Sequence, residues 1–148
     1  MNETIKLLTV AHATNFVLYH KTHVAHWNIT GPLFPQLHKM LEKQYEELWE
    51  QVDTYAEKLR QSQVFTPLSL CELIELSIID EYTEVLSAEQ YIESLLLDHV
   101  KFVELLKSLF HTAEHQNYVG MSNFIQDRVD SHEKIIWMLR STAFGVSV

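Results

Sequence analysis

Long stretches of this chain contain neither glycine nor proline, and this feature limits its possible folds more than any other. The 148 residues include only 3 Gly and 3 Pro. A protein built from β-strands needs turn residues about every 8–12 positions, and this chain does not supply them. Apolar residues recur at helical spacing between the few breakers. The sequence therefore predicts an all-α protein made of long helices.

The breakers divide the chain into four long segments and one short segment. We expect long helices over residues 2–29, 33–61, 87–115 and 121–144, and a short helix over residues 69–79. Four helices of similar length predict a four-helix bundle that forms a single domain over residues 1–148. The short helix lies in the long connection between the second and third long helices. A connection of that length predicts that the two halves run up-up, down-down.

Charge and hydropathy argue against several classes of protein. The net charge is −9, with 11 basic and 20 acidic residues, and no run of Lys or Arg forms the basic patch that a nucleic-acid binder needs. No apolar run approaches the roughly 18 residues of a membrane helix, and the N-terminus lacks the features of a signal peptide. We therefore expect a cytoplasmic protein. The one cysteine, Cys71, lies among apolar residues and is predicted to be a buried thiol.

The second long segment carries candidate metal ligands on one helical stripe. His38 and Glu42 are four residues apart, as are Asp53 and Glu57, so each pair shares a face. At 100° per residue all four fall within about 100° of one another. The two pairs are nevertheless about 16 Å apart along the helix axis. Metal–ligand bonds of about 2 Å cannot bridge that gap within one chain.

A symmetric dimer would bring the two pairs together. If the same helix of a second subunit lies antiparallel, with a two-fold axis near residues 47 and 48, His38 faces the partner subunit's Glu57. The same axis puts Glu42 opposite the partner subunit's Asp53. Each interface of this isologous kind would hold two identical sites.

The first helix offers a further ligand, because the turn at Gly31 can return His26 to the start of the second helix. Two imidazoles and three carboxylates suit iron, with zinc, manganese or cobalt as competitors. The alternative is that His26 is a satisfied core histidine and that the carboxylates form a solvated acidic stripe. No Glu is followed three residues later by His, which argues against a di-iron site inside one bundle.

Three blocks of the sequence resemble one known family. They are the run from His23 to His38 (HVAHWNITGPLFPQLH), the run from Val52 to Lys58 (VDTYAEK) and the run from Asp127 to Arg140 (DRVDSHEKIIWMLR). Together they resemble the Dps family, the ferritin-like mini-ferritins or DNA-binding proteins from starved cells. The resemblance covers nearly the whole chain.

The resemblance implies a hollow homo-dodecamer with ferroxidase sites at its two-fold interfaces. His26, His38 and Glu42 would bind iron together with Asp53 and Glu57 of the neighbouring subunit. The implied activity is oxidation of Fe²⁺, usually by hydrogen peroxide, followed by storage of ferric oxide in the cage and protection against oxidative damage. Asp127 and Asp130 are candidates for lining an iron pore, with surface carboxylates as the alternative.

Two other functions remain open at this point. The chain could form a Dps-like cage that condenses DNA with little iron chemistry, but its first residues offer only Lys6 and Glu3 where many members have a Lys-rich tail. We therefore do not expect DNA binding. The chain could also form a purely structural oligomer in which the acidic stripe is only an interface.

Overall fold

Five helices and no strand make up the part of the chain that the computed structural model describes, residues 2–142. They are α1 (Glu3–Asn28), α2 (Phe34–Gln61), α3 (Leu70–Leu76), α4 (Ala88–His115) and α5 (Val119–Arg140). The all-α prediction and the four long helices are confirmed. The short helix α3 is shorter than predicted, and α5 begins two residues earlier than predicted. It ends at Arg140, before the predicted end at residue 144, which itself lies outside the described residues.

Local side-chain chemistry explains where the helices begin and end. The Asn2 side chain accepts a hydrogen bond from the backbone N–H of Ile5 at 2.9 Å and caps α1. Ser87 and Gln90 form a reciprocal capping box at the start of α4. Between α1 and α2, Gly31 takes a φ angle of 113°, a conformation that side chains other than hydrogen disfavour.

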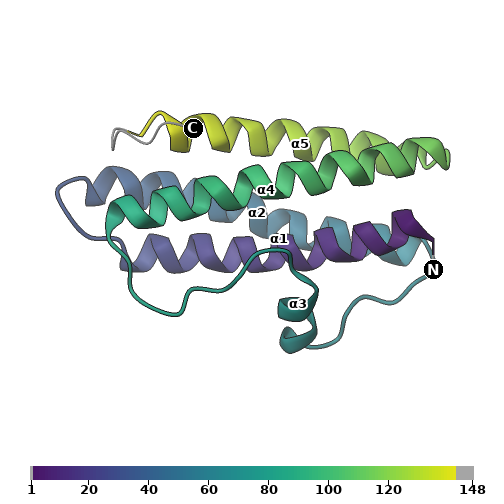
Figure 1. The fold of residues 1–148 in the computed structure, drawn as a ribbon, viewed down its shortest axis with the longest axis horizontal. Coiled ribbons are helices and arrows are strands. Elements are labelled where there is room, and N and C mark those ends of the chain that lie inside the picture. Colours follow the sequence, from purple (N-terminus) through teal and green to yellow (C-terminus); the bar gives the residue numbers. More distant parts are fainter. Residues whose placement is uncertain (1, 143–148) are drawn as a thin grey trace.

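The four long helices form a bundle of two antiparallel hairpins (Figure 1). Helices α1 and α2 are joined by residues 29–33, and α4 and α5 by residues 116–118. Connections this short force neighbouring helices to run in opposite directions. Residues 62–87 cross the length of the bundle, so α4 runs parallel to α2 (Figure 1). The predicted up-up, down-down order is therefore wrong: with one long crossover and two short loops, the order is up-down-down-up.

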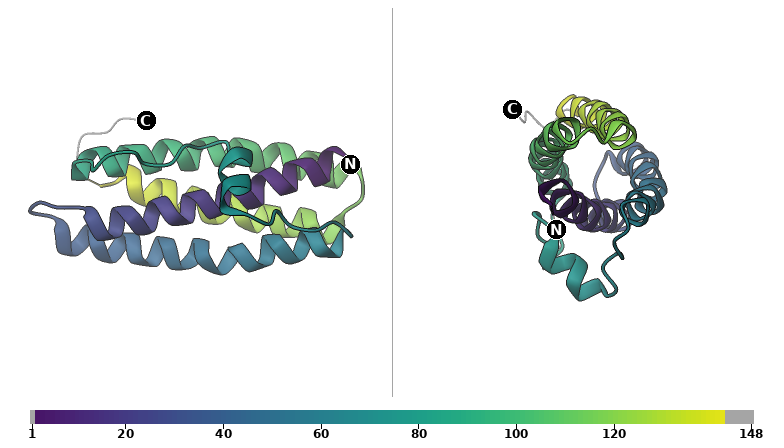
Figure 2. Two further views of the ribbon diagram at one scale, coloured as in Figure 1. Left: turned by 90° about the horizontal axis from the view of Figure 1, so that it is seen from below. Right: turned by 90° about the vertical axis from the view of Figure 1, so that its right-hand side faces the viewer.

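Helix α1 is buried on most of its surface. It packs against α2, α4 and α3, and an end-on view shows α3 outside the ring of long helices, beside α1 (Figure 2). Because three neighbours surround it, α1 lacks a continuous polar face. Its buried residues include the polar side chains Asn15, Lys21 and His26, and these side chains need partners inside the protein.

The prediction of a buried thiol at Cys71 is wrong, because Cys71 is exposed. Helix α3 is only seven residues long and buries only Leu73. Two of its other apolar side chains, Leu70 and Ile74, are also exposed in the subunit, and Leu76 is half-buried. A helix this short presents one narrow stripe to the bundle, and Cys71 lies off that stripe. Within the described residues, none of the helices has both the length and the apolar character needed to cross a membrane.

Candidate metal centre

The end of α1 and the start of α2 bring two of the predicted ligands into contact. The rings of His26 and His38 are stacked, with centroids 3.7 Å apart and an angle of 13° between their planes. His26 is buried and His38 is half-buried. The turn at Gly31 makes this contact possible, as the sequence predicted.

Reciprocal hydrogen bonds to the backbone fix both rings. Nδ1 of His26 donates to the carbonyl oxygen of His38 at 2.7 Å, and Nδ1 of His38 donates to the carbonyl oxygen of His26 at 2.7 Å. A carbonyl oxygen can only accept, so each Nδ1 carries the hydrogen. The lone pair of each neutral ring then lies on Nε2. This is the arrangement that orients a histidine as a metal ligand, because the second nitrogen is already held.

The three carboxylates lie along α2 beyond His38. Glu42 is half-buried, whereas Asp53 and Glu57 are exposed. Among the described residues, no three His, Cys, Asp or Glu side chains of one subunit are grouped closely enough to hold a metal ion. The structure thus brings His26 and His38 together but leaves Asp53 and Glu57 farther along α2, where Asp53 is about 16 Å beyond Glu42. Their contribution from a partner subunit stays a prediction.

The donor atoms at this end of the bundle suit a divalent transition metal. Two imidazole nitrogens and nearby carboxylate oxygens match the ligands that iron and zinc accept in proteins. The ion pairs in the described part of the chain involve Asp98, Glu104 and Glu47. Glu42, Asp53 and Glu57 are in none of them, so among the described residues no basic side chain forms an ion pair with these carboxylates.

An aromatic cluster adjoins the histidine pair, and sequence reasoning did not identify it. The ring of Tyr45 stacks on His23, with centroids 3.8 Å apart and an interplanar angle of 11°, and meets the edge of His26 at 5.1 Å. Trp27 also packs against His23, with the two ring centroids 4.0 Å apart. The only sequence signal was the helical spacing of His23 and Trp27 on α1, which is common in any helix.

Two tyrosines in this cluster stay protonated at neutral pH. Burial raises the pKa of Tyr19. Burial, together with the negative charges of Glu42 and Glu46, raises the pKa of Tyr45. Both side chains are therefore phenols, able to donate a hydrogen bond.

A second histidine pair lies in the centre of the bundle and was also missed. His99 of α4 and His132 of α5 are fully buried, with their Nδ1 atoms 2.8 Å apart. The guanidinium of Arg128 lies 3.4 Å from Nε2 of His132 and forms a two-pronged ion pair with Glu47 of α2. Since 33 residues separate the two histidines, no local spacing in the sequence could indicate their contact.

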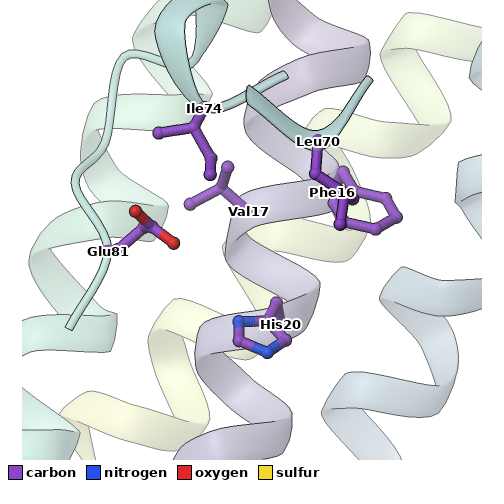
Figure 3. Close-up of a pocket in the computed structure, with 6 residues that line it drawn as sticks. All are labelled: Phe16, Val17, His20, Leu70, Ile74 and Glu81. Carbon is purple, nitrogen blue, oxygen red and sulfur yellow. The ribbon is translucent and has the colours of Figure 1, made fainter. Parts of the chain in front are cut away.

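Several further histidine and aspartate side chains, including the pore candidates Asp127 and Asp130, lie on the surface of the subunit. His111, His115, Asp127 and Asp130 are all exposed. A pocket of about 190 Å³ lies between α1, α3 and the crossover (Figure 3). Apolar side chains form most of its lining, with His20 and Glu81 as its polar groups (Figure 3). Neither member of the stacked histidine pair lines it, so the pocket is separate from the candidate metal centre.

Comparisons with known proteins agree with this architecture. The model of a family described as "Ferritin-like domain" matches residues 5–143. A "DNA protection during starvation protein" from Brevibacillus brevis is 31% identical over 125 residues, which is 84% of each chain. The crystal structure of Dps from Staphylococcus aureus has a TM-score of 0.90 and 29% identity, covering 94% of this chain and 93% of its own.

A structure from Vibrio cholerae shares the fold. It is described as a Dps protein and "a member of a broad superfamily of ferritin-like diiron-carboxylate proteins". Its TM-score is 0.89 at 24% identity, covering 94% of this chain and 87% of that one.

Proposed function

This chain belongs to the Dps family of ferritin-like proteins, and from that premise we propose that it oxidises Fe²⁺ and stores the ferric product inside a homo-oligomeric cage. The family places the chain among iron-storage and protective proteins. The observation that carries the more specific proposal is the stacked histidine pair. His26 and His38 are held by each other's backbone, and each keeps Nε2 for a ligand.

We propose that each site is shared between two subunits. His26, His38 and Glu42 come from one subunit, and Asp53 and Glu57 come from its two-fold partner. The absence of a complete ligand group within the described residues of one subunit is compatible with this division. The antiparallel pairing of two α2 helices about residues 47 and 48 provides the geometry. We expect a dodecamer, as in the cages that the family resemblance implies.

The residues favour loss of an electron from iron, which is the substrate. Hard carboxylate oxygens stabilise Fe³⁺ more than Fe²⁺, so Glu42, Asp53 and Glu57 lower the free energy of the oxidised ion. The fixed imidazoles hold the ion without rearranging, which lowers the barrier. Two Fe²⁺ ions supply the two electrons that convert one hydrogen peroxide to two hydroxide ions. Zn²⁺ accepts the same donors and has no redox chemistry, so we expect it to inhibit.

A mixed oligomer tests the shared site directly. His38→Ala and Asp53→Ala each break every site in their own oligomers. The two variants are then refolded or expressed together. Each two-fold pair made of one subunit of each variant contains one site with both native residues and one site with neither. We expect each variant alone to oxidise Fe²⁺ at the protein-free rate and the mixture to recover about a quarter of the sites, as random isologous pairing requires.

The controls separate the possible failures. Glu133→Ala, which changes an exposed carboxylate on α5, should keep the native rate alone and in any mixture. If the mixture stays inactive while its particle mass matches the native cage, the site is not shared in this way. Native activity in both single variants would instead show that these residues do not bind the substrate iron.

A further inference from the structure

The middle of the bundle contains a group of polar side chains that the proposed function does not use. Ferritin-like di-iron proteins bind metal at this place, through inward-facing glutamates of all four helices and histidines of two of them. Asn15 joins α1 to the same level, because its amide donates to a backbone carbonyl of α2 at 3.1 Å. We call the four residues that meet here, each near the middle of its helix, the core cluster: Glu47 of α2, His99 of α4, and Arg128 and His132 of α5.

The guanidinium of Arg128 lies between two groups that can also bind a metal ion. Its Nη2 atom is 3.1 Å from Oε2 of Glu47 and 3.4 Å from Nε2 of His132, and its Nη1 atom pairs with Oε1 of Glu47. A guanidinium only donates, so the carboxylate and the imidazole both direct lone pairs at one point. Such atoms bind divalent metal ions at about 2.0–2.2 Å, so each would move inward by about 1 Å to hold an ion there.

The charges of the core cluster balance without a metal ion. Burial acts to lower the pKa of Arg128, but the hydrogen bond and the charge of Glu47 raise it above its ordinary value, so the guanidinium stays charged. Burial lowers the pKa of both His99 and His132, so both rings are neutral at pH 7. Glu47 is the one carboxylate of the cluster, and Arg128 already neutralises it. A second cation would therefore have no counter-charge.

We propose that Arg128 is the resident cation of the bundle: it occupies a ligand set, Glu47 and His132, that otherwise binds a divalent metal ion, and so it keeps metal out of the subunit core. Arg128 is 3% exposed and His132 is fully buried, so an incoming ion cannot displace the guanidinium unless the helices separate. Arg128 thereby determines where in the molecule iron binds. The inference goes beyond the proposed function, because it concerns a place inside one subunit.

Cobalt binding by a variant without the arginine tests this proposal. Co²⁺ accepts the same nitrogen and oxygen donors as Fe²⁺, and it absorbs visible light when protein side chains bind it. The background protein carries His26→Ala and His38→Ala, so the proposed ferroxidase site does not contribute. In that background we expect Arg128→Ala to bind an additional Co²⁺ ion in each subunit, with new visible absorption. Because the ion binds the folded protein, Co²⁺ should also raise the melting temperature of this variant alone.

Three further variants show whether the new site has the proposed ligands. Arg128→Lys keeps a positive charge in the core and should gain no Co²⁺ site. Arg140→Ala removes an exposed arginine at the end of α5 and is the matched control, which should gain none either. Adding Glu47→Gln to Arg128→Ala removes the carboxylate, so the additional ion and its absorption should be lost.

The outcomes separate this proposal from the proposed function. The proposal is wrong if Arg128→Ala folds and binds no more Co²⁺ than the background protein, or if the new site survives Glu47→Gln. It is also wrong if Arg128→Ala stays unfolded with Co²⁺ present, because the ion should then replace the guanidinium. Since the background lacks both stacked histidines, none of these results depends on the ferroxidase site. Ferrous oxidation by the native protein tests that site separately.

Discussion

The molecule contains two pairs of touching histidines, and they differ in what each ring does with its second nitrogen. In the outer pair, His26 and His38, each ring donates from Nδ1 to a backbone carbonyl and keeps a lone pair on Nε2. In the inner pair, His99 and His132, the rings bond to each other through Nδ1. The first arrangement leaves two donor atoms for a ligand. The second uses the nitrogens to hold helices α4 and α5 together.

The hydrogen-bond partners of the inner pair determine which ring nitrogens carry a hydrogen. A guanidinium only donates, so Arg128 directs an N–H at Nε2 of His132. His132 then carries its hydrogen on Nδ1 and donates to Nδ1 of His99. His99 in turn carries its hydrogen on Nε2, which is buried without a partner among the described residues. No further proton fits between the two rings, whereas the outer pair has two open nitrogens. The same residue type therefore serves binding in one place and packing in the other.

Replacing one histidine of each pair by alanine should give the largest difference between the two pairs. His38→Ala should reduce iron oxidation to the protein-free rate but lower the free energy of unfolding by less than about 1 kcal/mol, because the side chain is half-buried. His132→Ala should do the reverse, costing about 3 kcal/mol through a cavity and unpaired buried groups. Urea unfolding and ferrous oxidation of both variants, at one protein concentration, check the contrast. Loss of oxidation in His132→Ala with an intact cage would contradict it.

The ion pair that supports the inner histidines should be the next most sensitive feature. Glu47→Leu leaves Arg128, which is only 3% exposed, without its carboxylate. Removing one partner of a buried ion pair costs about 3–5 kcal/mol, and we expect the lower end of that range because the Glu47 side chain is 32% exposed. The double variant Glu47→Leu with Arg128→Met should recover part of that loss, since no charge is left buried. A double-mutant cycle of unfolding free energies measures the coupling, and strictly additive losses would show that the pair does not act as a unit.

Acid should destabilise the fold through the inner pair, because burial opposes protonation of both of its rings. Burial lowers the pKa of His99 to about 3, and burial with the neighbouring His99 and Arg128 lowers the pKa of His132 well below its usual range. Below about pH 6.5 these two histidines bind protons in the unfolded chain but not in the folded protein. The free energy of unfolding therefore falls as the pH drops and is regained as the pH rises. Between about pH 7 and about pH 5.5 we expect a loss of about 1 kcal/mol for each histidine.

Variants of the inner pair and of an exposed histidine test whether this acid sensitivity belongs to the core. The double change His99→Leu and His132→Leu should flatten the dependence of the unfolding free energy on pH over that interval. His111→Leu, which changes an exposed histidine, should leave the dependence as it is. A native slope that survives the double change would assign the acid sensitivity to other groups.

The two histidine pairs also show which features of the structure could be predicted from the sequence. The long helices followed from the positions of a few breakers, and the contact of His26 with His38 followed from the tight turn between them. Both depend on residues close together in the chain. The family resemblance added the ferritin-like fold and the family itself, which the comparisons support.

What the sequence could not predict depends on how distant segments pack. The pair His99 and His132 joins α4 to α5 across 33 residues, and a buried histidine has no mark in the sequence that separates it from a ligand. Cys71 was misplaced because an apolar run was taken as buried, whereas within the described residues α3 packs chiefly against one helix, α1. The helix directions were also wrong, since the number of long crossovers decides them and periodicity does not.

The smallest expected effect concerns the turn at Gly31, which joins the two helices that carry the outer pair. Gly31 has a φ of 113° and no atom within 4 Å of the place where a Cβ would lie, so Gly31→Ala strains the backbone without a clash. We expect the free energy of unfolding to fall by about 1 kcal/mol and Zn²⁺ to bind more weakly at His26 and His38, with the pH dependence of the inner pair unchanged.

Gly120 is the matched control, because it lies in α5 and its added Cβ would meet only the end of the Lys58 side chain. Gly120→Ala should raise stability by up to about 1 kcal/mol and leave Zn²⁺ binding as it is. Equal Zn²⁺ affinity in both variants, measured by calorimetry, would mean that the two rings keep their positions without the turn.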